Sequence, residues 1–207
     1  MAVERRVERR RAATRERLVS TALALFATHG IYDVTVEDIT EAADVGKGTF
    51  YQHFPSKAAI IHHLLHDGVN ALLARCRREG RSAGIEKERV KRLLLAQFRF
   101  FDGRPDLLIL FHQVRGMLKL QVPEGRSLQK EYTRYIRFLV AELGASLDRR
   151  RYSRVRLMQI ALVMAGLVTG YLSYRMILGL KKHGAADLEV PTRLFLEGMV
   201  GNGQAML

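Results

Sequence analysis

The sequence predicts an all-α protein in which a small N-terminal helical unit is joined to a larger helical bundle. Apolar residues recur at helical spacing along most of the chain, and no stretch alternates apolar and polar residues long enough for a strand. The 207 residues are 48% hydrophobic and include four prolines, which excludes a disordered or collagen-like chain and allows a sizeable core.

The first predicted helix covers residues 14–28. Its apolar residues follow the i, i+4, i+7, i+8 spacing of one helix face and end before His29-Gly30, a usual C-terminal signal. These residues are Leu18, Ala22, Leu25 and Phe26.

Two short helices follow. Thr35 precedes Val36-Glu37-Asp38, a pattern typical of a capping box, and predicts a helix to about Ala43. Asp44-Val45-Gly46 interrupts it, and the next helix is predicted from Lys47 to about His53. Pro55 and Ser56 end that helix and begin the next.

The rest of the chain predicts longer helices separated by Gly- and Pro-containing breaks. We expect them at residues 56–81, 86–102, 105–120, 127–147, 153–182 and 191–199.

The charge balance favours a polyanionic partner but does not locate its site. The chain has 34 Lys and Arg against 21 Asp and Glu, a formal net charge of +13. Residues 1–57 account for only +1 of this, although the tail to Arg17 holds seven Arg and three Glu. The site must therefore be found from motifs.

Residues 35–57 read as two short helices joined by a tight turn, with a small apolar set facing the first helix. Such a helix-turn-helix places its second helix in the DNA major groove, with the N-terminal residues of that helix near base edges. The first turn, Lys47-Gly48-Thr49, has little bulk, and Tyr51, His53 and Lys57 offer donors for phosphate oxygens. The predicted apolar set is Ile39, Ala43, Val45, Phe50 and Phe54, closing on Leu18, Ala22 and Phe26.

The stretch Gly-Lys-Gly-Thr-Phe-Tyr-Gln-His-Phe-Pro-Ser-Lys (residues 46–57) resembles the recognition helix of the TetR family of bacterial transcription regulators. The preceding stretch from Phe26 to Ile39 resembles that family's first helix and its entry into the second. Two positions depart from the family pattern. Asp44 stands where the family commonly has Gly, and Gly46 stands where it commonly has Ser.

The resemblance implies a helix-turn-helix DNA-binding domain over residues 1–60 and a helical effector-binding and dimerisation domain over residues 61–207. It implies that Lys47, Gly48 and Thr49 face bases, and that Thr35, Gly46, Tyr51, His53 and Lys57 contact phosphates. The Arg-rich tail is either a basic arm that follows the DNA backbone or a solvated helix end. His53 is alternatively a packed core residue.

The helix predicted at residues 153–182 contains an uncharged run from Leu157 to Tyr174. Its small residues favour close approach of another helix, and the resemblance implies a homodimer interface there. We predict Ala161, Ala165, Gly166, Thr169 and Gly170 in this interface. A membrane span is the alternative, disfavoured by the polar residues in the run and the arginines that flank it.

Aromatic and Met residues on the central helices are candidates for an effector pocket, although such stripes are more often plain core. They are Phe98, Phe101, Phe111, His112, Met117, Tyr171 and Tyr174. Nothing in the sequence identifies the effector.

The sequence does not favour metal binding, a catalytic cysteine or another enzymatic site. His62 and His66 have metal-compatible spacing, but His63 stands where a zinc protease has its Glu, so we expect solvated helix surface and no metal. Cys76 has three neighbouring arginines, which suggests a lowered pKa and at most a redox-sensing role. We place no catalytic set and no cofactor.

The sequence therefore predicts a cytoplasmic bacterial regulator, nucleoid-associated when bound to DNA, without membrane attachment and without enzymatic activity. We expect a homodimer that represses from a pseudo-palindromic double-stranded operator and is released by an unidentified small-molecule effector. A non-specific nucleoid-type protein and a membrane-associated helical protein are the alternatives.

Overall fold

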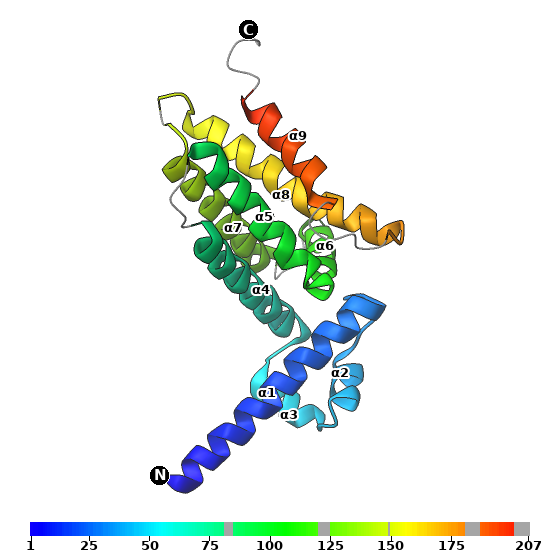
Figure 1. The fold of residues 1–207 in the computed structure, drawn as a ribbon. Coiled ribbons are helices and arrows are strands. Elements are labelled where there is room, and N and C mark those ends of the chain that lie inside the picture. Colours follow the sequence, from blue (N-terminus) through cyan, green and yellow to red (C-terminus); the bar gives the residue numbers. More distant parts are fainter. Residues whose placement is uncertain (81–84, 120–124, 149, 181–186, 201–207) are drawn as a thin grey trace. The chain divides into compact units, whose positions relative to one another are not determined.

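The computed structural model describes residues 1–80, 85–119, 125–148, 150–180 and 187–200. Within these ranges the chain forms nine α-helices and no strand, which confirms the predicted fold class (Figure 1). The helices are α1 (Ala2–His29), α2 (Val36–Ala42), α3 (Lys47–His53), α4 (Lys57–Gly80), α5 (Glu86–Asp102), α6 (Pro105–Lys119), α7 (Gly125–Ser146), α8 (Arg154–Ile177) and α9 (Glu189–Val200).

Two helix ends differ from the prediction by more than two residues. Helix α1 begins at Ala2 rather than near Thr14, because the Arg-rich tail consists mostly of good helix formers. Helix α8 ends at Ile177 rather than Lys182, because Gly179 adopts φ 62°. The N–H of Leu180 then bonds back to the carbonyl of Arg175 at 3.0 Å, which closes the helix end.

The chain forms two compact units. The first comprises Met1–Gly68 with Ile109–Gln129, and the second comprises Val69–Leu108 with Lys130–Leu207. The division falls inside α4, α6 and α7. The domain boundary predicted at residue 60 lies within the first segment of the first unit and stays a prediction.

The first unit is built around the apolar face of α1. Seven of the eight predicted core side chains are buried, and Val45 is half-buried. The turn after α1 adds Ile31 and Val34 to this core. Gln113 on α6 secures the same turn, since its side chain accepts from the Ile31 N–H and donates to the Phe26 carbonyl, both at 2.9 Å.

In the second unit α5 packs against α8 and α9. A polar group lies inside this core. The fully buried Gln97 donates to the Leu93 carbonyl at 2.9 Å and accepts from the Tyr135 hydroxyl at 2.5 Å. These bonds satisfy the amide in a site that has no access to water.

Helix α8 is the one helix in the described ranges that is long and apolar enough to cross a membrane. A core helix of a soluble protein has the same length and composition. Leu157, Ala161, Met164 and Val168 are buried, so one face of α8 packs within the second unit.

Candidate nucleic-acid interface

The turn between α2 and α3 is set by local hydrogen bonds. At the start of α2 the Thr35 hydroxyl accepts from the Asp38 N–H at 3.1 Å, and the Asp38 carboxylate accepts from the Thr35 N–H at 2.7 Å. These bonds confirm the predicted capping box, and they hold the pKa of Asp38 below its usual value. Asp44 then takes a left-handed conformation with φ 50°, at the position where the family commonly has Gly.

Helix α3 is anchored by one side and exposed on the other. Phe50 is fully buried and packs edge-to-face against the Tyr51 ring, with centroids 5.4 Å apart. Phe54 ends the helix and is also buried. This anchoring fixes the helix while Lys47, Gly48 and Tyr51 remain exposed.

The residues predicted to face bases lie in the first turn of α3. Lys47 and Gly48 are exposed, and Thr49 is half-buried. A Cβ built on Gly48 or Gly46 meets nothing within 4 Å, so neither glycine is required by packing in this chain. The Lys47 ammonium forms an ion pair with the Glu37 carboxylate of α2, a partner that sequence reasoning missed.

The residues predicted to contact phosphates differ in their exposure and in the hydrogen bonds that they already make. The Tyr51 side chain is 54% exposed. The Thr35 hydroxyl already donates to the Asp38 carboxylate at 2.8 Å, and Gly46 offers only backbone. The Lys57 ammonium donates to the carbonyls of Ile31 and Val34 at 2.8 and 2.7 Å, which leaves one of its three N–H groups. The main role of Lys57 in this structure is to hold the turn before α2.

His53 lies half-buried at the end of α3, beside the arginines of α1. A small crevice of about 360 Å³ is lined by Arg11, Arg15, Gln52 and His53, among others. Burial and the charges of Arg11 and Arg15 lower the pKa of His53 below its usual value. The imidazole is therefore neutral at pH 7. Its side chain is half-buried, so His53 is not the fully packed core residue of the alternative interpretation.

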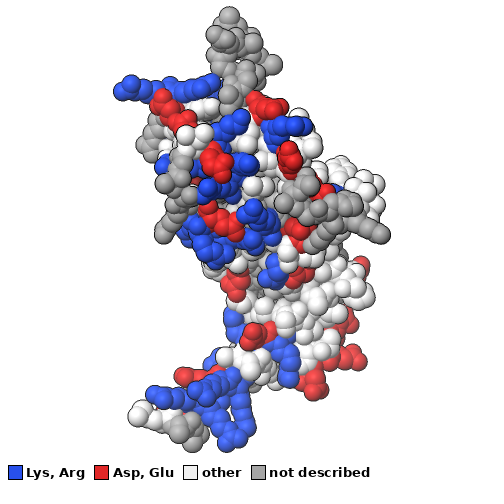
Figure 2. Space-filling model, viewed as in Figure 1, with Lys and Arg blue, Asp and Glu red and all other residues white. Residues whose placement is uncertain are grey.

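The Arg-rich half of α1 is a helix with exposed side chains. Lys and Arg atoms gather over the N-terminal end of α1 (Figure 2). Arg15 is held near the domain, because its guanidinium lies 4.8 Å from the Phe54 ring centroid and 3.2 Å from His63. The tail therefore has the geometry of a solvated helix end, and its contact with DNA stays a prediction.

The residues predicted for an effector pocket are mostly packed. Phe98, Phe101 and Phe111 are buried, as is Met117, while His112 and Tyr171 are half-buried and Tyr174 is 69% exposed. Phe98 and Tyr171 contact each other edge-to-face with centroids 5.8 Å apart. None of the seven lines the cavity of about 870 Å³ that lies between α5 and α9. The effector role of the seven stays a prediction.

The small residues predicted for a dimer interface differ in burial. Ala161 and Thr169 are buried inside the second unit, Ala165 and Gly170 are half-buried, and Gly166 is exposed. Larger apolar side chains on α8 and α9 are exposed instead, and no local pattern distinguishes them from core residues. They are Val155, Met158, Leu162, Val163, Tyr174, Met176 and Ile177 on α8, with Val190 and Leu194 on α9.

Cys76 corrects one expectation. The thiol is fully buried, and burial raises its pKa to about 12 in spite of the neighbouring arginines. A thiol in this environment is not a reactive thiolate at neutral pH. His62 and His66 lie one turn apart with ring centroids 6.2 Å apart, and the described residues contain no group of three or more His, Cys, Asp and Glu arranged to hold a metal ion.

The fold and this site define a helix-turn-helix protein with a larger helical unit. Residues 18–64 match the family described as "Bacterial regulatory proteins, tetR family", so this part of the chain is a TetR-family DNA-binding domain. The transcriptional repressor KstR2 of Mycobacterium tuberculosis is 30% identical over 107 residues, which are 52% of this chain and 54% of that protein. KstR2 of Mycolicibacterium smegmatis is 28% identical over 100 residues, 48% of this chain and 49% of that protein. The chain thus spans about half the length of the curated relatives it matches.

Solved structures share the fold over more of the chain. The fatty acid degradation regulator FadR of Bacillus halodurans has a TM-score of 0.75 at 17% identity and covers 90% of this chain and 96% of its own. FadR of Bacillus subtilis, solved in complex with stearoyl-CoA, has a TM-score of 0.73 at 16% identity, covering 88% and 98%. At these identities the likeness is one of fold.

Proposed function

We propose that this chain is a sequence-specific DNA-binding transcriptional regulator without enzymatic activity, acting in the bacterial cytoplasm and nucleoid-associated when bound to DNA. The observation that carries the proposal is the geometry of α3. Phe50 and Phe54 anchor this helix from one side, while Lys47, Gly48 and Tyr51 stay exposed on the other. A rigid short helix with a low-bulk first turn is suited to the major groove.

The regulator acts as a homodimer in this proposal. Val155, Met158, Leu162 and Gly166 recur at spacings of three and four residues, so they form one exposed stripe along α8. Exposed apolar stripes of this kind mark protein interfaces. A two-fold dimer would present two copies of α3 to half-sites about one helical turn of DNA apart, and so favour a pseudo-palindromic operator.

Repression relieved by a small-molecule effector completes the proposal, and the repressor names of the KstR2 relatives support it. An effector releases DNA only by binding the DNA-incompetent conformation more tightly than the DNA-competent one.

Selection of binding sites from a random double-stranded DNA pool at roughly physiological salt tests this function. We expect enrichment of an inverted repeat. The matched control is Lys47→Ala, since Lys47 is exposed and its loss leaves the core intact. A relaxed base preference in that variant supports base reading by α3. Binding without any enriched sequence would contradict the proposal and favour a non-specific nucleoid-type protein.

A further inference from the structure

Most of the positive charge of this chain lies outside the segment that forms the helix-turn-helix. Residues 58–207 hold 25 Lys and Arg against 13 Asp and Glu, whereas residues 1–57 are close to neutral. Contact of α3 with DNA does not use this excess, and neither does the apolar stripe of α8. The location of the excess charge therefore indicates a further surface.

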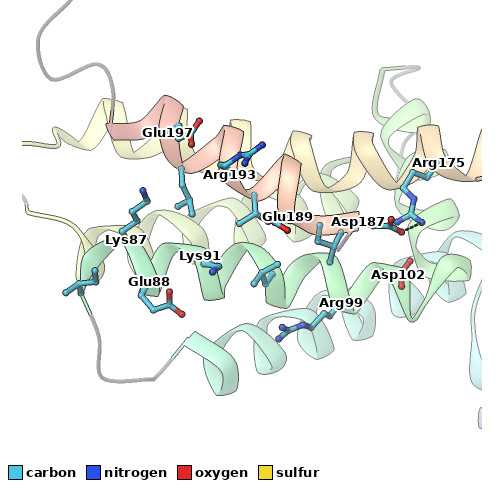
Figure 3. Close-up of a pocket in the computed structure, with 15 residues that line it drawn as sticks. Lys87, Glu88, Lys91, Arg99, Asp102, Arg175, Asp187, Glu189, Arg193 and Glu197 are labelled. Atoms are coloured by element: carbon cyan, nitrogen blue, oxygen red, sulfur yellow. Dashed lines mark ion pairs between the residues drawn. The ribbon is translucent and has the colours of Figure 1, made fainter. Parts of the chain in front are cut away.

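Over much of the second unit the basic side chains are balanced by acidic ones. Five basic and five acidic residues line a cavity of about 870 Å³ between α5 and α9, and both signs of charge occur on both helices (Figure 3). Six arginines of this unit also lie 2.6–3.1 Å from a carboxylate oxygen. They are Arg75, Arg92, Arg99, Arg104, Arg134 and Arg175. Arginines with such partners attract a polyanion weakly, because the neighbouring carboxylates repel it.

The connection between α7 and α8 is different. Residues 150–156 contain four arginines and no acidic residue. All four side chains are exposed, and within the described parts of the chain none of their guanidinium groups forms an ion pair. We refer to Arg150, Arg151, Arg154 and Arg156 as the junction arginines.

The backbone that carries the junction arginines is held in place. The Asp148 carboxylate accepts from the Arg150 N–H at 2.9 Å, and the Asp148 carbonyl accepts from the Tyr152 N–H at 3.0 Å. The Tyr152 side chain is 6% exposed and anchors the turn. Ser153 then caps α8, since its hydroxyl accepts from the Arg156 N–H at 3.2 Å. The arginines therefore extend from a defined surface.

Four guanidinium groups on one fixed segment suit a ligand with repeated anionic groups. A guanidinium group binds phosphate oxygens through two parallel N–H bonds. Duplex DNA carries one negative charge per about 1.7 Å of its axis, so its backbone can engage all four groups. A single small anion would engage one or two of them. Contacts to phosphates give affinity and orientation but carry no sequence information.

An anionic membrane is also a polyanion, and the junction fits it less well. Basic segments that bind membranes combine their charge with apolar side chains that enter the lipid. In residues 150–156 the Tyr152 ring is buried, and the exposed Val155 belongs to the α8 stripe proposed for the homodimer. The junction thus offers charge without an apolar anchor of its own.

We propose that the junction arginines form a second DNA-contacting surface, which binds phosphates and reads no bases. This goes beyond the proposed function, which assigns DNA contact to α3 in the first unit. The phosphates belong either to the duplex that α3 holds or to a second duplex, and the experiment distinguishes these two sources.

The test variant combines Arg150→Gln, Arg151→Gln, Arg154→Gln and Arg156→Gln. The matched control removes the same charge from exposed positions elsewhere in the second unit, by Lys87→Gln, Lys91→Gln, Lys130→Gln and Arg193→Gln. Both variants should stay folded by circular dichroism, because the side chains are exposed and Gln is a good helix former. The two halves of the test variant, positions 150 and 151 or positions 154 and 156, are measured as well.

Fluorescence anisotropy with a random-sequence duplex, at several salt concentrations, measures the contacts. Each lost phosphate contact lowers the slope of log K against log salt by about 0.9. We expect the test variant to lose about two to four from this slope and to bind at least tenfold more weakly at low salt. Each half should lose part of that amount, and the control should lose less than about one.

Two further arms identify the source of the phosphates. In the first, a selected site is compared with the same site extended by flanking DNA. In the second, protein held on an immobilised selected site is tested for capture of a labelled random duplex. A gain in affinity from flanking DNA assigns the contact to the same duplex, and capture assigns it to a second one. Either effect should be lost in the test variant and kept in the control.

Equal salt slopes in the wild type and the test variant would overturn the proposal. So would a loss of binding to phosphatidylglycerol vesicles with DNA affinity unchanged, which would assign the arginines to a membrane. A change of oligomeric state with an unchanged slope would overturn it too and assign them to a second copy. Site selection keeps the two proposals apart. An enriched site with an unchanged slope contradicts this proposal alone, whereas a reduced slope without an enriched site contradicts the proposed function alone.

Discussion

The Lys47 ammonium at the start of α3 is paired with the Glu37 carboxylate in the first turn of α2. The hydrogen bond from Lys47 is the largest cause of the lowered pKa of Glu37, so the Glu37 carboxyl group is ionised at neutral pH. Both side chains are 56% exposed. A base edge or phosphate that takes Lys47 must therefore compete with Glu37, and the carboxylate itself repels the DNA backbone.

Glu37→Gln should tighten DNA binding about threefold at moderate salt, because it releases Lys47 and removes one negative charge beside the groove-facing helix. Fluorescence anisotropy with a selected site measures this. The same substitution in a Lys47→Ala background is the control, and its effect should be smaller there. Equal effects in the two backgrounds would mean that Glu37 acts on DNA without Lys47.

Gly48→Ala should stabilise the free protein and weaken its binding to DNA. The added Cβ meets nothing within 4 Å, and Ala is favoured over Gly in a helix by roughly 0.5–1 kcal/mol. In the complex the methyl group would occupy space that the base edges need, so we expect at least tenfold weaker binding. Gly116→Ala on α6 is the matched control, since its Cβ also meets nothing, and DNA affinity should not change. Unchanged affinity in Gly48→Ala would place Gly48 away from the bases.

Asp44→Gly should raise the free energy of unfolding by roughly 0.5–1 kcal/mol. Asp44 has φ 50°, a conformation that costs a non-glycine residue about 1–2 kcal/mol and costs Gly nothing. Glu41→Gly is the control of opposite sign, because Glu41 lies in the regular helix α2, where Gly is unfavourable. Urea denaturation followed by circular dichroism compares the two. A loss of stability in Asp44→Gly would show that the Asp side chain stabilises the turn by more than its backbone strain costs.

Local sequence patterns were sufficient to predict the helix-turn-helix. The capping box at Thr35 depends on residues three apart, and the left-handed turn at Asp44 follows from its place between two short helices. The capping box and the break at Asp44-Val45-Gly46 were predicted because their causes lie within a few residues of each other; the left-handed conformation of Asp44 was not predicted.

Long-range packing explains what was missed. Lys57 was expected on phosphate, but its ammonium is held by carbonyls 26 and 23 residues earlier in the chain. Thr192 is buried because α9 packs against α5, about a hundred residues away in sequence. No pattern in the neighbouring sequence predicts the hydrogen bonds of Lys57 or the burial of Thr192. The amphipathic spacing of α5 predicts a buried face but not the cavity beside it.

Leu162→Glu should dissociate the proposed homodimer. Leu162 lies in the apolar stripe of α8 and is 52% exposed in the single chain, so a carboxylate there is tolerated by the monomer but would be desolvated in an interface. Sedimentation velocity measures the change in mass. Val7→Glu is the matched control, since Val7 is 58% exposed and belongs to α1 in the first unit. A dimer that persists in Leu162→Glu would exclude this face of α8 from the interface.

DNA binding should tighten as the pH falls from about 7.5 to 5.5, and His53 should be the cause. Burial and the charges of Arg11 and Arg15 lower its pKa from 6.5 in the free protein. A phosphate beside the imidazole would offset those charges and raise the pKa in the complex, so the complex binds more protons and gains affinity at lower pH. Anisotropy titrations at several pH values should show up to about a tenfold gain per pH unit, lost in His53→Gln. His63→Gln is the control, because the pKa of His63 is also lowered by burial, and that variant should keep the dependence on pH. A pH dependence that persists unchanged in His53→Gln would remove His53 from the phosphate contacts.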